Sequence, residues 1–119
     1  MALRCRALGL VFVAGLVLAA CAAPVSQMPR AGADGVRFTV VAPAARSVAV
    51  AGDFNGWSPT AHPLKPAGRD GAWSGVVAIP EGEYRFMYVI DGKRWLTPPA
   101  ADDFVRDGFG NFNGVVVVP

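Results

Sequence analysis

A tryptophan placed directly after a turn signal is the feature of this sequence best suited to chemistry. Residues 48–51 read Val-Ala-Val-Ala, and Asn55-Gly56 precede Trp57 a few positions later. Asn and Gly tolerate the positive φ angles of tight turns, so this pattern predicts a strand followed by a turn that carries Trp57. An exposed aromatic face on a turn can stack on the apolar C–H face of a pyranose ring. The pattern alone leaves open the alternative that Trp57 fills the core.

Residues that would support catalysis or metal binding are sparse. His62 is the single histidine and precedes Pro63 in an expected surface loop, which makes a metal site improbable. Asp102 and Asp103 are neighbours, whereas glycoside hydrolysis requires carboxylates about 5–9.5 Å apart across a cleft. We interpret this acidic pair as a solvated loop. We therefore expect no catalytic residue, no metal and no cofactor.

The first twenty residues predict a secretory signal. Arg4 and Arg6 precede an apolar stretch over residues 7–20, which is shorter than the roughly 20 residues of a transmembrane helix. The segment Leu18-Ala19-Ala20-Cys21 resembles the lipobox of bacterial lipoproteins, in which the chain is cut before a cysteine that receives diacylglycerol. The resemblance implies a mature chain that begins at lipidated Cys21 and is held by several acyl chains. Because Ala22 rather than Asp follows, we expect an exported protein anchored in the outer membrane of the cell envelope.

Cysteine usage and charge exclude further classes. Cys5 lies in the signal and Cys21 would carry the lipid, so no disulfide is expected. The chain has 11 Lys plus Arg against 9 Asp plus Glu, and loss of Arg4 and Arg6 with the signal balances them. Without net positive charge or a clustered basic face, binding to nucleic acid or to an anionic surface has no electrostatic support.

The chain divides into a signal (residues 1–20), a lipidated tether (residues 21–34) and one domain (residues 35–119). The tether is rich in Ala, Pro and Gly and has no periodic apolar pattern. The domain is long enough for a single core. Its short apolar runs, separated by turn residues, predict an all-β sandwich of about seven strands with almost no helix.

Six strands of this sandwich can be delimited from the sequence. They are expected at residues 36–40, 47–51, 72–79, 83–90, 93–96 and 115–118. Alternation is clearest in residues 83–90, where the aromatic residues and Ile90 fall on one face. Asp91-Gly92 predicts a two-residue hairpin turn, and residues 100–114 a long polar loop of functional importance. We interpret Phe54 and Trp73 as core residues.

An ordered set of motifs resembles the family 48 carbohydrate-binding modules. The motifs are Gly52-Asp53-Phe54-Asn55-Gly56-Trp57, Pro80-Glu81-Gly82-Glu83-Tyr84, Val89-Ile90-Asp91-Gly92 with Trp95, and Asn111-Phe112-Asn113. This family includes the glycogen-binding domain of the AMP-activated protein kinase β subunit and the early-set domains of isoamylase and branching enzymes. The resemblance covers about residues 35–119. It implies an immunoglobulin-like, early-set β-sandwich that binds α-1,4-glucans such as glycogen, starch or maltodextrins.

The resemblance also implies which residues bind sugar. Trp57 matches the first aromatic platform and Trp95 the second, and Phe109, Asn111 and Asn113 match a late loop that closes over the ligand. The two asparagines are equally able to satisfy backbone groups of that loop.

Two positions depart from the family pattern. Met87 stands where the family commonly has a lysine, so a cation that bonds sugar hydroxyls is lost. The thioether of Met87 is only a weak hydrogen-bond acceptor. One extra residue precedes Trp95, and such a shift turns a strand residue to the other face unless a bulge compensates. Lys93 or Arg94 is a candidate for the missing cation.

These expectations favour non-catalytic binding of an α-glucan by a lipid-anchored domain. The alternative is a protein-interaction or structural module of the envelope that keeps the sandwich but has a degenerate sugar site, because a fold does not determine a function. A third possibility is an accessory domain that serves a glucan-active enzyme partner.

Overall fold

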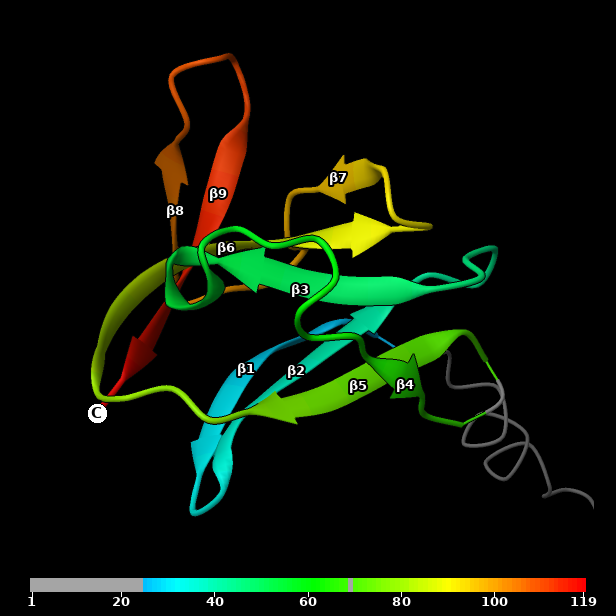
Figure 1. Ribbon diagram of the computed structural model, residues 1–119, viewed down its shortest axis with the longest axis horizontal. Coiled ribbons are helices and arrows are strands. Elements are labelled where there is room, and N and C mark those ends of the chain that lie inside the picture. The colour runs from blue at the N-terminus through cyan, green and yellow to red at the C-terminus, as the bar shows by residue number, and fades with distance from the viewer. Residues whose placement is uncertain (1–24, 69) are drawn as a thin grey trace, which may run out of the picture.

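The computed structural model describes residues 25–68 and 70–119, which form two antiparallel β-sheets packed face to face (Figure 1). The first sheet has the strand order β1-β2-β5-β4, with β1 at Gln27–Gly32, β2 at Gly35–Val41, β5 at Ala72–Val77 and β4 at Lys65–Pro66. The second sheet has the order β3-β6-β9-β8, with β3 at Val48–Gly52, β6 at Gly82–Ile90, β9 at Phe112–Val118 and β8 at Asp103–Arg106. A short strand β7, Arg94–Leu96, pairs with the C-terminal part of β6.

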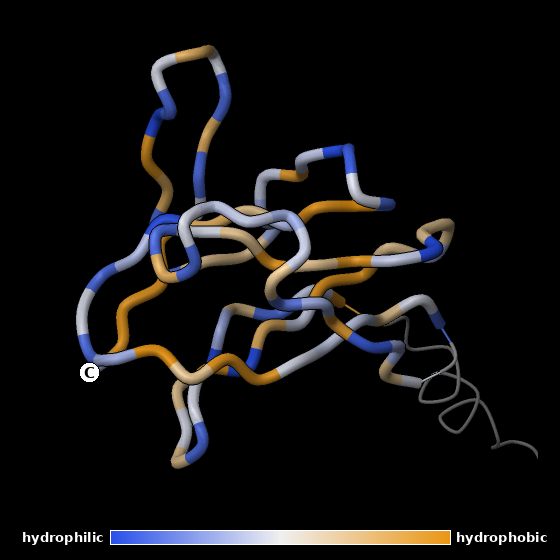
Figure 2. The backbone as a smooth tube through the Cα atoms, in the orientation of Figure 1, coloured by the Kyte–Doolittle hydropathy of each residue, from blue (hydrophilic) through white to orange (hydrophobic). Residues whose placement is uncertain are grey.

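The core lies between the sheets and follows from residue alternation. In β2, the buried residues Val36, Phe38 and Val40 alternate with more accessible ones, and Figure 2 shows the corresponding change of hydropathy along the strands. In β6, Phe86 and Tyr88 are fully buried, and both pack edge-on against Phe38 from the other sheet. The aromatic contacts therefore join the two layers at their centre.

The predicted all-β sandwich is confirmed, with nine strands in the described part of the chain instead of about seven. The core interpretation also holds for Phe54 and Trp73, which pack against the main core cluster. The indole N–H of Trp73 donates to the Ala42 carbonyl at 3.2 Å.

Three strands were not expected from the sequence, and one of them is the two-residue strand β4. Residues 27–32, expected within the tether, form β1, because the segment is held by backbone pairing to β2 and buries only Pro29. Residues 103–106, expected within a long loop, form β8, whose four side chains are all exposed and so give no apolar alternation. The expected signal (residues 1–20) and Cys21 lie outside the described residues. Within those residues, no helix is long and apolar enough to span a membrane.

Candidate functional site

The rings of Trp57 and Trp95 lie together on the outer face of the second sheet. Their centroids are 6.5 Å apart and their planes are inclined by 39°. Trp95 pairs with Val89, and Val89 pairs with Ala49 on the other side of β6. Paired residues of antiparallel strands share a face, and Trp57 packs on the small cluster that includes Ala49 and Val89. Trp95 remains 42% exposed, so the pair forms an accessible aromatic surface.

The extra residue before Trp95 is absorbed by the hairpin turn. Asp91 and Gly92 have φ angles of 55° and 78°, and the Lys93 N–H donates to the Ile90 carbonyl at 3.2 Å. Ile90 pairs with Arg94 rather than with Lys93. Lys93 is therefore left out of the ladder, and Trp95 keeps the face that it shares with Trp57.

The backbone at Trp57 adopts an uncommon conformation. Gly56 and Trp57 have φ angles of 67° and 60°, and the Trp57 N–H donates to the Gly52 carbonyl at 2.9 Å. The positive φ angles thus fall one residue later than the Asn-Gly turn signal predicts, since Asn55 ends a 3₁₀ turn, η1 (Asp53–Asn55). A left-handed conformation costs a non-glycine residue about 1–2 kcal/mol. Such strain persists where surrounding structure enforces it, and it concentrates at functional sites.

Asn55 enforces this turn with its side chain. Its Oδ1 accepts hydrogen bonds from the backbone N–H groups of Gly52 and Ser58 at 3.1 and 3.2 Å. Its Nδ2 donates to the Val50 carbonyl at 3.1 Å and lies 2.8 Å from Nδ1 of His62. Asn55 is therefore a structural residue, as the sequence interpretation of a turn former predicts, and His62 supports it.

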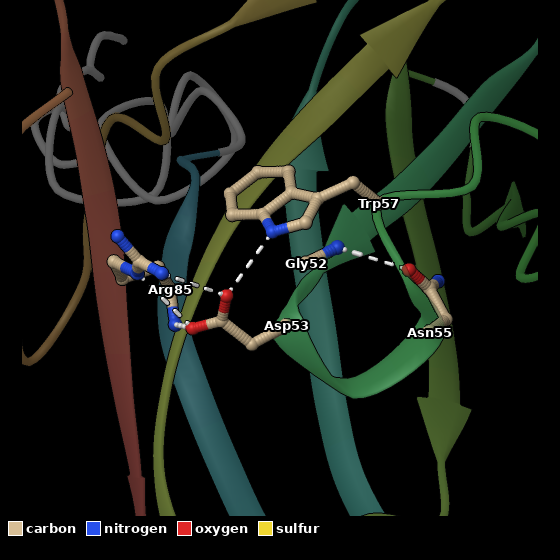
Figure 3. A network of polar contacts seen from close by, with 5 residues as sticks. All are labelled: Gly52, Asp53, Asn55, Trp57 and Arg85. Atoms are coloured by element: carbon tan, nitrogen blue, oxygen red, sulfur yellow. Dashed lines mark hydrogen bonds and ion pairs between the residues drawn. The ribbon is translucent and has the colours of Figure 1, made fainter. Parts of the chain in front are cut away.

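Asp53 orients the indole of Trp57 (Figure 3). The indole N–H donates to Asp53 Oδ1 at 3.1 Å. Asp53 also accepts from the backbone N–H and from Nε of Arg85, at 2.8 and 3.1 Å. Partial burial acts to raise the pKa of Asp53, but the bonds from Arg85 and Trp57 outweigh it and hold this pKa below its usual value. The carboxylate thus links Trp57 to a strand of the sheet.

The sequence interpretation missed Asp53 and Arg85 as site residues. They are 32 positions apart in the sequence. They meet because Gly52, the last residue of β3, pairs with Phe86, which places Asp53 beside Arg85. The Arg85 guanidinium brings a cation to the edge of the aromatic surface. The position of Arg85 beside Asp53 depends on the strand register, which could not be predicted from the sequence.

The cations expected to replace the family lysine lie elsewhere. Arg94 pairs with the core residue Ile90, so its side chain is on the opposite face from Trp95. Lys93 lines a hollow with Arg46 and Asp91 at the end of the sandwich. Backbone N–H groups of Arg46 and Ser47 bond the Asp91 carboxylate and lower its pKa.

Met87 and Asn113 share the face of the aromatic pair. Arg85 pairs with Val115, so two residues further along each strand Met87 and Asn113 come alongside one another. Asn113 is only 7% exposed. Its side-chain amide carries both donor and acceptor atoms on the face of the aromatic pair.

Phe109 and Asn111 lie at the tip of the β8–β9 hairpin, which stands away from the rest of the sheet (Figure 1). Phe109 is 90% exposed. The Asp107 carboxylate holds the tip by accepting from the backbone N–H groups of Phe109 and Asn111, at 2.7 and 3.1 Å. Of the five predicted sugar-binding residues, the structure thus gathers Trp57, Trp95 and Asn113 on one face and leaves Phe109 and Asn111 at a separate tip.

The adjacent acidic residues have structural partners. Asp102 Oδ2 accepts from the Val117 N–H at 2.7 Å, and Asp103 Oδ1 accepts from the Phe104 N–H at 2.7 Å. Among the described residues, no group of three or more His, Cys, Asp or Glu side chains could hold a metal ion.

Comparison with known families gives a match over most of the domain. The model of carbohydrate-binding module 48, described as the isoamylase N-terminal domain, matches residues 23–101. This range includes both tryptophans of the aromatic surface and ends before the β8–β9 hairpin.

The chain is also similar to 1,4-alpha-glucan branching enzymes. It is 43% identical over 72 residues to the enzyme of Pseudomonas aeruginosa, which covers 60% of this chain and 10% of the enzyme. It is 49% identical over 72 residues to an enzyme of Streptomyces avermitilis, which covers 58% of this chain and 9% of the enzyme. The chain therefore matches about a tenth of the length of these relatives.

Proposed function

The chain belongs to the carbohydrate-binding module 48 family, and we propose that it binds α-1,4-glucans without catalysing their conversion. The observation that carries this proposal is the Trp57–Trp95 pair, with ring centroids 6.5 Å apart on one accessible face. The names of the branching-enzyme relatives, whose substrate is a 1,4-alpha-glucan, support the choice of ligand class.

The geometry of the rings favours a curved chain. Flat aromatic surfaces bury the C–H faces of pyranose rings. Successive glucose units turn relative to one another in an α-1,4-linked chain, whereas a β-1,4-linked chain is flat and ribbon-like. Two ring planes inclined by 39° suit sugar faces that turn along the chain. This inclination supports maltodextrin, starch or glycogen over cellulose-type ligands.

Polar groups around the rings supply hydrogen bonds to sugar hydroxyls. Arg85 lies at one side of the surface through its ion pair with Asp53 at 3.1 Å, and it takes the role that Met87 leaves open. Asn113 offers an amide with both donor and acceptor atoms. Phe109 and Asn111 contribute when a chain is long enough to extend from the aromatic pair to the hairpin tip.

Export and lipid anchoring form the second part of the proposal. The residue pattern Leu18-Ala19-Ala20-Cys21 supports cleavage before Cys21 and attachment of the mature chain to the outer membrane. Mass spectrometry of the membrane-extracted protein would find an acylated Cys21 as its N-terminal residue. An unmodified cysteine, or a retained signal, would contradict the anchoring.

A protein-interaction role is the second candidate function. The β8–β9 hairpin exposes Phe104, Phe109 and Phe112, and β8 is an edge strand. Such a surface suits an envelope protein or a glucan-active enzyme as partner. Pull-down of one defined envelope protein that persists in Trp57→Ala would favour this candidate.

Affinity electrophoresis tests the glucan proposal directly. The protein is run through native gels that contain glycogen, amylopectin or dextran, a glucan of different linkage. We expect retardation by glycogen and amylopectin that Trp57→Ala removes. Equal mobility in all gels would contradict the proposal.

A further inference from the structure

The outer face of the first sheet is basic. Arg30 of β1 pairs with Arg37 of β2, which places both side chains on one face. Two residues along β2, Thr39 pairs with Ser74 of β5, which in turn pairs with Lys65 of β4. Arg30, Arg37 and Lys65 are all exposed. Three strands thus bring together cations that are scattered along the sequence, and the expectation that no basic cluster exists is wrong for the folded domain.

Among the described residues, these cations form no ion pair. In the described part of the chain the ion pair found is Arg85–Asp53, on the other sheet. Arg37 donates to the Ser74 hydroxyl at 3.0 Å. Because a hydroxyl is neutral, this hydrogen bond does not balance the positive charge of Arg37. Asp34, at the β1–β2 turn, lines the same hollow as Arg30 and Arg37, but no ion pair joins it to either arginine among the described residues. Like charges placed opposite one another on paired strands destabilise a sheet, so an external anion would be favoured here.

The chain joins the domain through this same sheet. β1 is the edge strand of the sheet, and just before it Ser26 Oγ accepts a hydrogen bond from the Val41 N–H at 3.0 Å. Cys21 precedes Val25, the first described residue, by four positions. Four residues span at most about 14 Å. A lipid on Cys21 would therefore hold the first sheet close to the membrane surface.

We propose that the outer face of the first sheet, carrying Arg30, Arg37 and Lys65, docks on the anionic phospholipid headgroups of the membrane. Val76, which is exposed and pairs with Arg37, adds an apolar side chain to the contact. Docking places the second sheet away from the bilayer, so that the Trp57–Trp95 surface faces a polysaccharide. This orientation rests on the proposed anchoring at Cys21.

The test uses the lipidated mature protein in vesicles of phosphatidylcholine, with or without one third phosphatidylglycerol. Hydrogen exchange of the backbone amides of β1, and of the Lys65 amide in β4, reports docking, because these two elements are the edge strands of the first sheet. Each Lys or Arg near an anionic surface contributes about fivefold in affinity, so three contribute about a hundredfold. We expect exchange in these strands to slow at least about tenfold in the anionic vesicles alone, and high salt to remove the effect.

Two variants of equal net charge distinguish docking by this face from nonspecific attraction of the whole protein to anionic vesicles. Arg30→Gln/Arg37→Gln/Lys65→Gln should lose the protection, whereas Lys93→Gln/Arg94→Gln/Arg106→Gln should retain it. Equal exchange in both kinds of vesicle, equal loss in both variants, or protection of β3 and β7 in place of the first sheet would each overturn the proposal.

Sugar binding and anchoring are scored separately on the same proteins. The basic-face variant should bind maltoheptaose as the unmodified protein does, and Trp57→Ala should retain its protection in anionic vesicles. An absence of glucan binding together with anionic protection would refute the glucan proposal and support docking. If Cys21 carries no lipid, the proposed anchoring is wrong, and the proposed orientation at the membrane is wrong as well.

Discussion

The outer faces of the two sheets present opposite kinds of surface. On the second sheet, Trp57 is held by a carboxylate and a strained turn, and it lies 6.5 Å from Trp95. On the first sheet, Arg30 and Arg37 stand side by side and form no ion pair within the described part of the chain. An ordered pair of rings is preorganised for a ligand of defined shape. Mobile cations on long side chains suit a diffuse anionic partner. One sandwich thus separates a shape-specific surface from a charge-specific one.

The largest expected effect is that of Trp57→Ala on glucan affinity. A central aromatic contact contributes about 2 kcal/mol or more to binding, which is about thirtyfold in affinity. Trp57 lies outside the main core cluster, so thermal unfolding should remain cooperative. Phe104→Ala, which removes an exposed ring of the β8–β9 hairpin, is the matched control and should bind normally. Loss of folding in Trp57→Ala would support the alternative in which this ring fills the core.

Trp95→Ala should weaken glucan binding by up to about tenfold, as expected for a single stacking contact. Its ring is 42% exposed, and its removal should change the free energy of unfolding by less than about 0.5 kcal/mol. Titration of the variant with maltoheptaose measures this effect. An unchanged affinity would mean that Trp57 forms the platform alone.

Asp53→Asn should lower glucan affinity by about two- to fivefold. The substitution removes the negative charge that pairs with Arg85 and that accepts a hydrogen bond from the indole of Trp57. The pKa of Asp53 is lowered in the folded protein, so its contribution to stability is complete above the ordinary pKa of 3.8. That contribution is lost as the pH falls through the lower folded value. Thermal unfolding followed across this acidic range should show a steeper loss of stability in the unmodified protein than in Asp53→Asn. Parallel profiles would show that Asp53 does not stabilise the turn.

Phe109→Ala should have the smallest effect, below about threefold, and only on long ligands. Phe109 lies at the hairpin tip, four residues before Asn113, and four residues span at most about 14 Å. Maltotriose should therefore bind the variant normally, while maltoheptaose should bind slightly less well. A large loss with maltotriose would place the hairpin tip over the aromatic pair in the bound state.

The sandwich could be predicted because residue alternation reports which face of a strand is buried. Residues 83–90 show this most clearly, and they form the central strand of the second sheet. β1 and β8 were missed because each is an edge strand with almost no buried residue. Their position depends on backbone pairing, which leaves no apolar pattern in the sequence.

The site was predictable where its residues carry a recognisable motif, and not where they depend on register. The tryptophans were identified from their surroundings in the sequence, but the shared face depends on Lys93 being left out of the ladder between β6 and β7. Arg85 and the basic face could not be predicted from the sequence, because strand pairing brings together residues that are distant in sequence, such as Thr39, Ser74 and Lys65. Net charge, which is insensitive to position, could not reveal either cluster.

Calorimetric titration with maltoheptaose and cellohexaose tests whether the Trp57–Trp95 surface binds an α-linked glucan. We expect a saturable heat with maltoheptaose, none with cellohexaose, and loss of the maltoheptaose signal in Trp57→Ala. No heat with maltoheptaose, equal binding of both oligosaccharides, or an unchanged affinity in a folded Trp57→Ala would contradict this expectation.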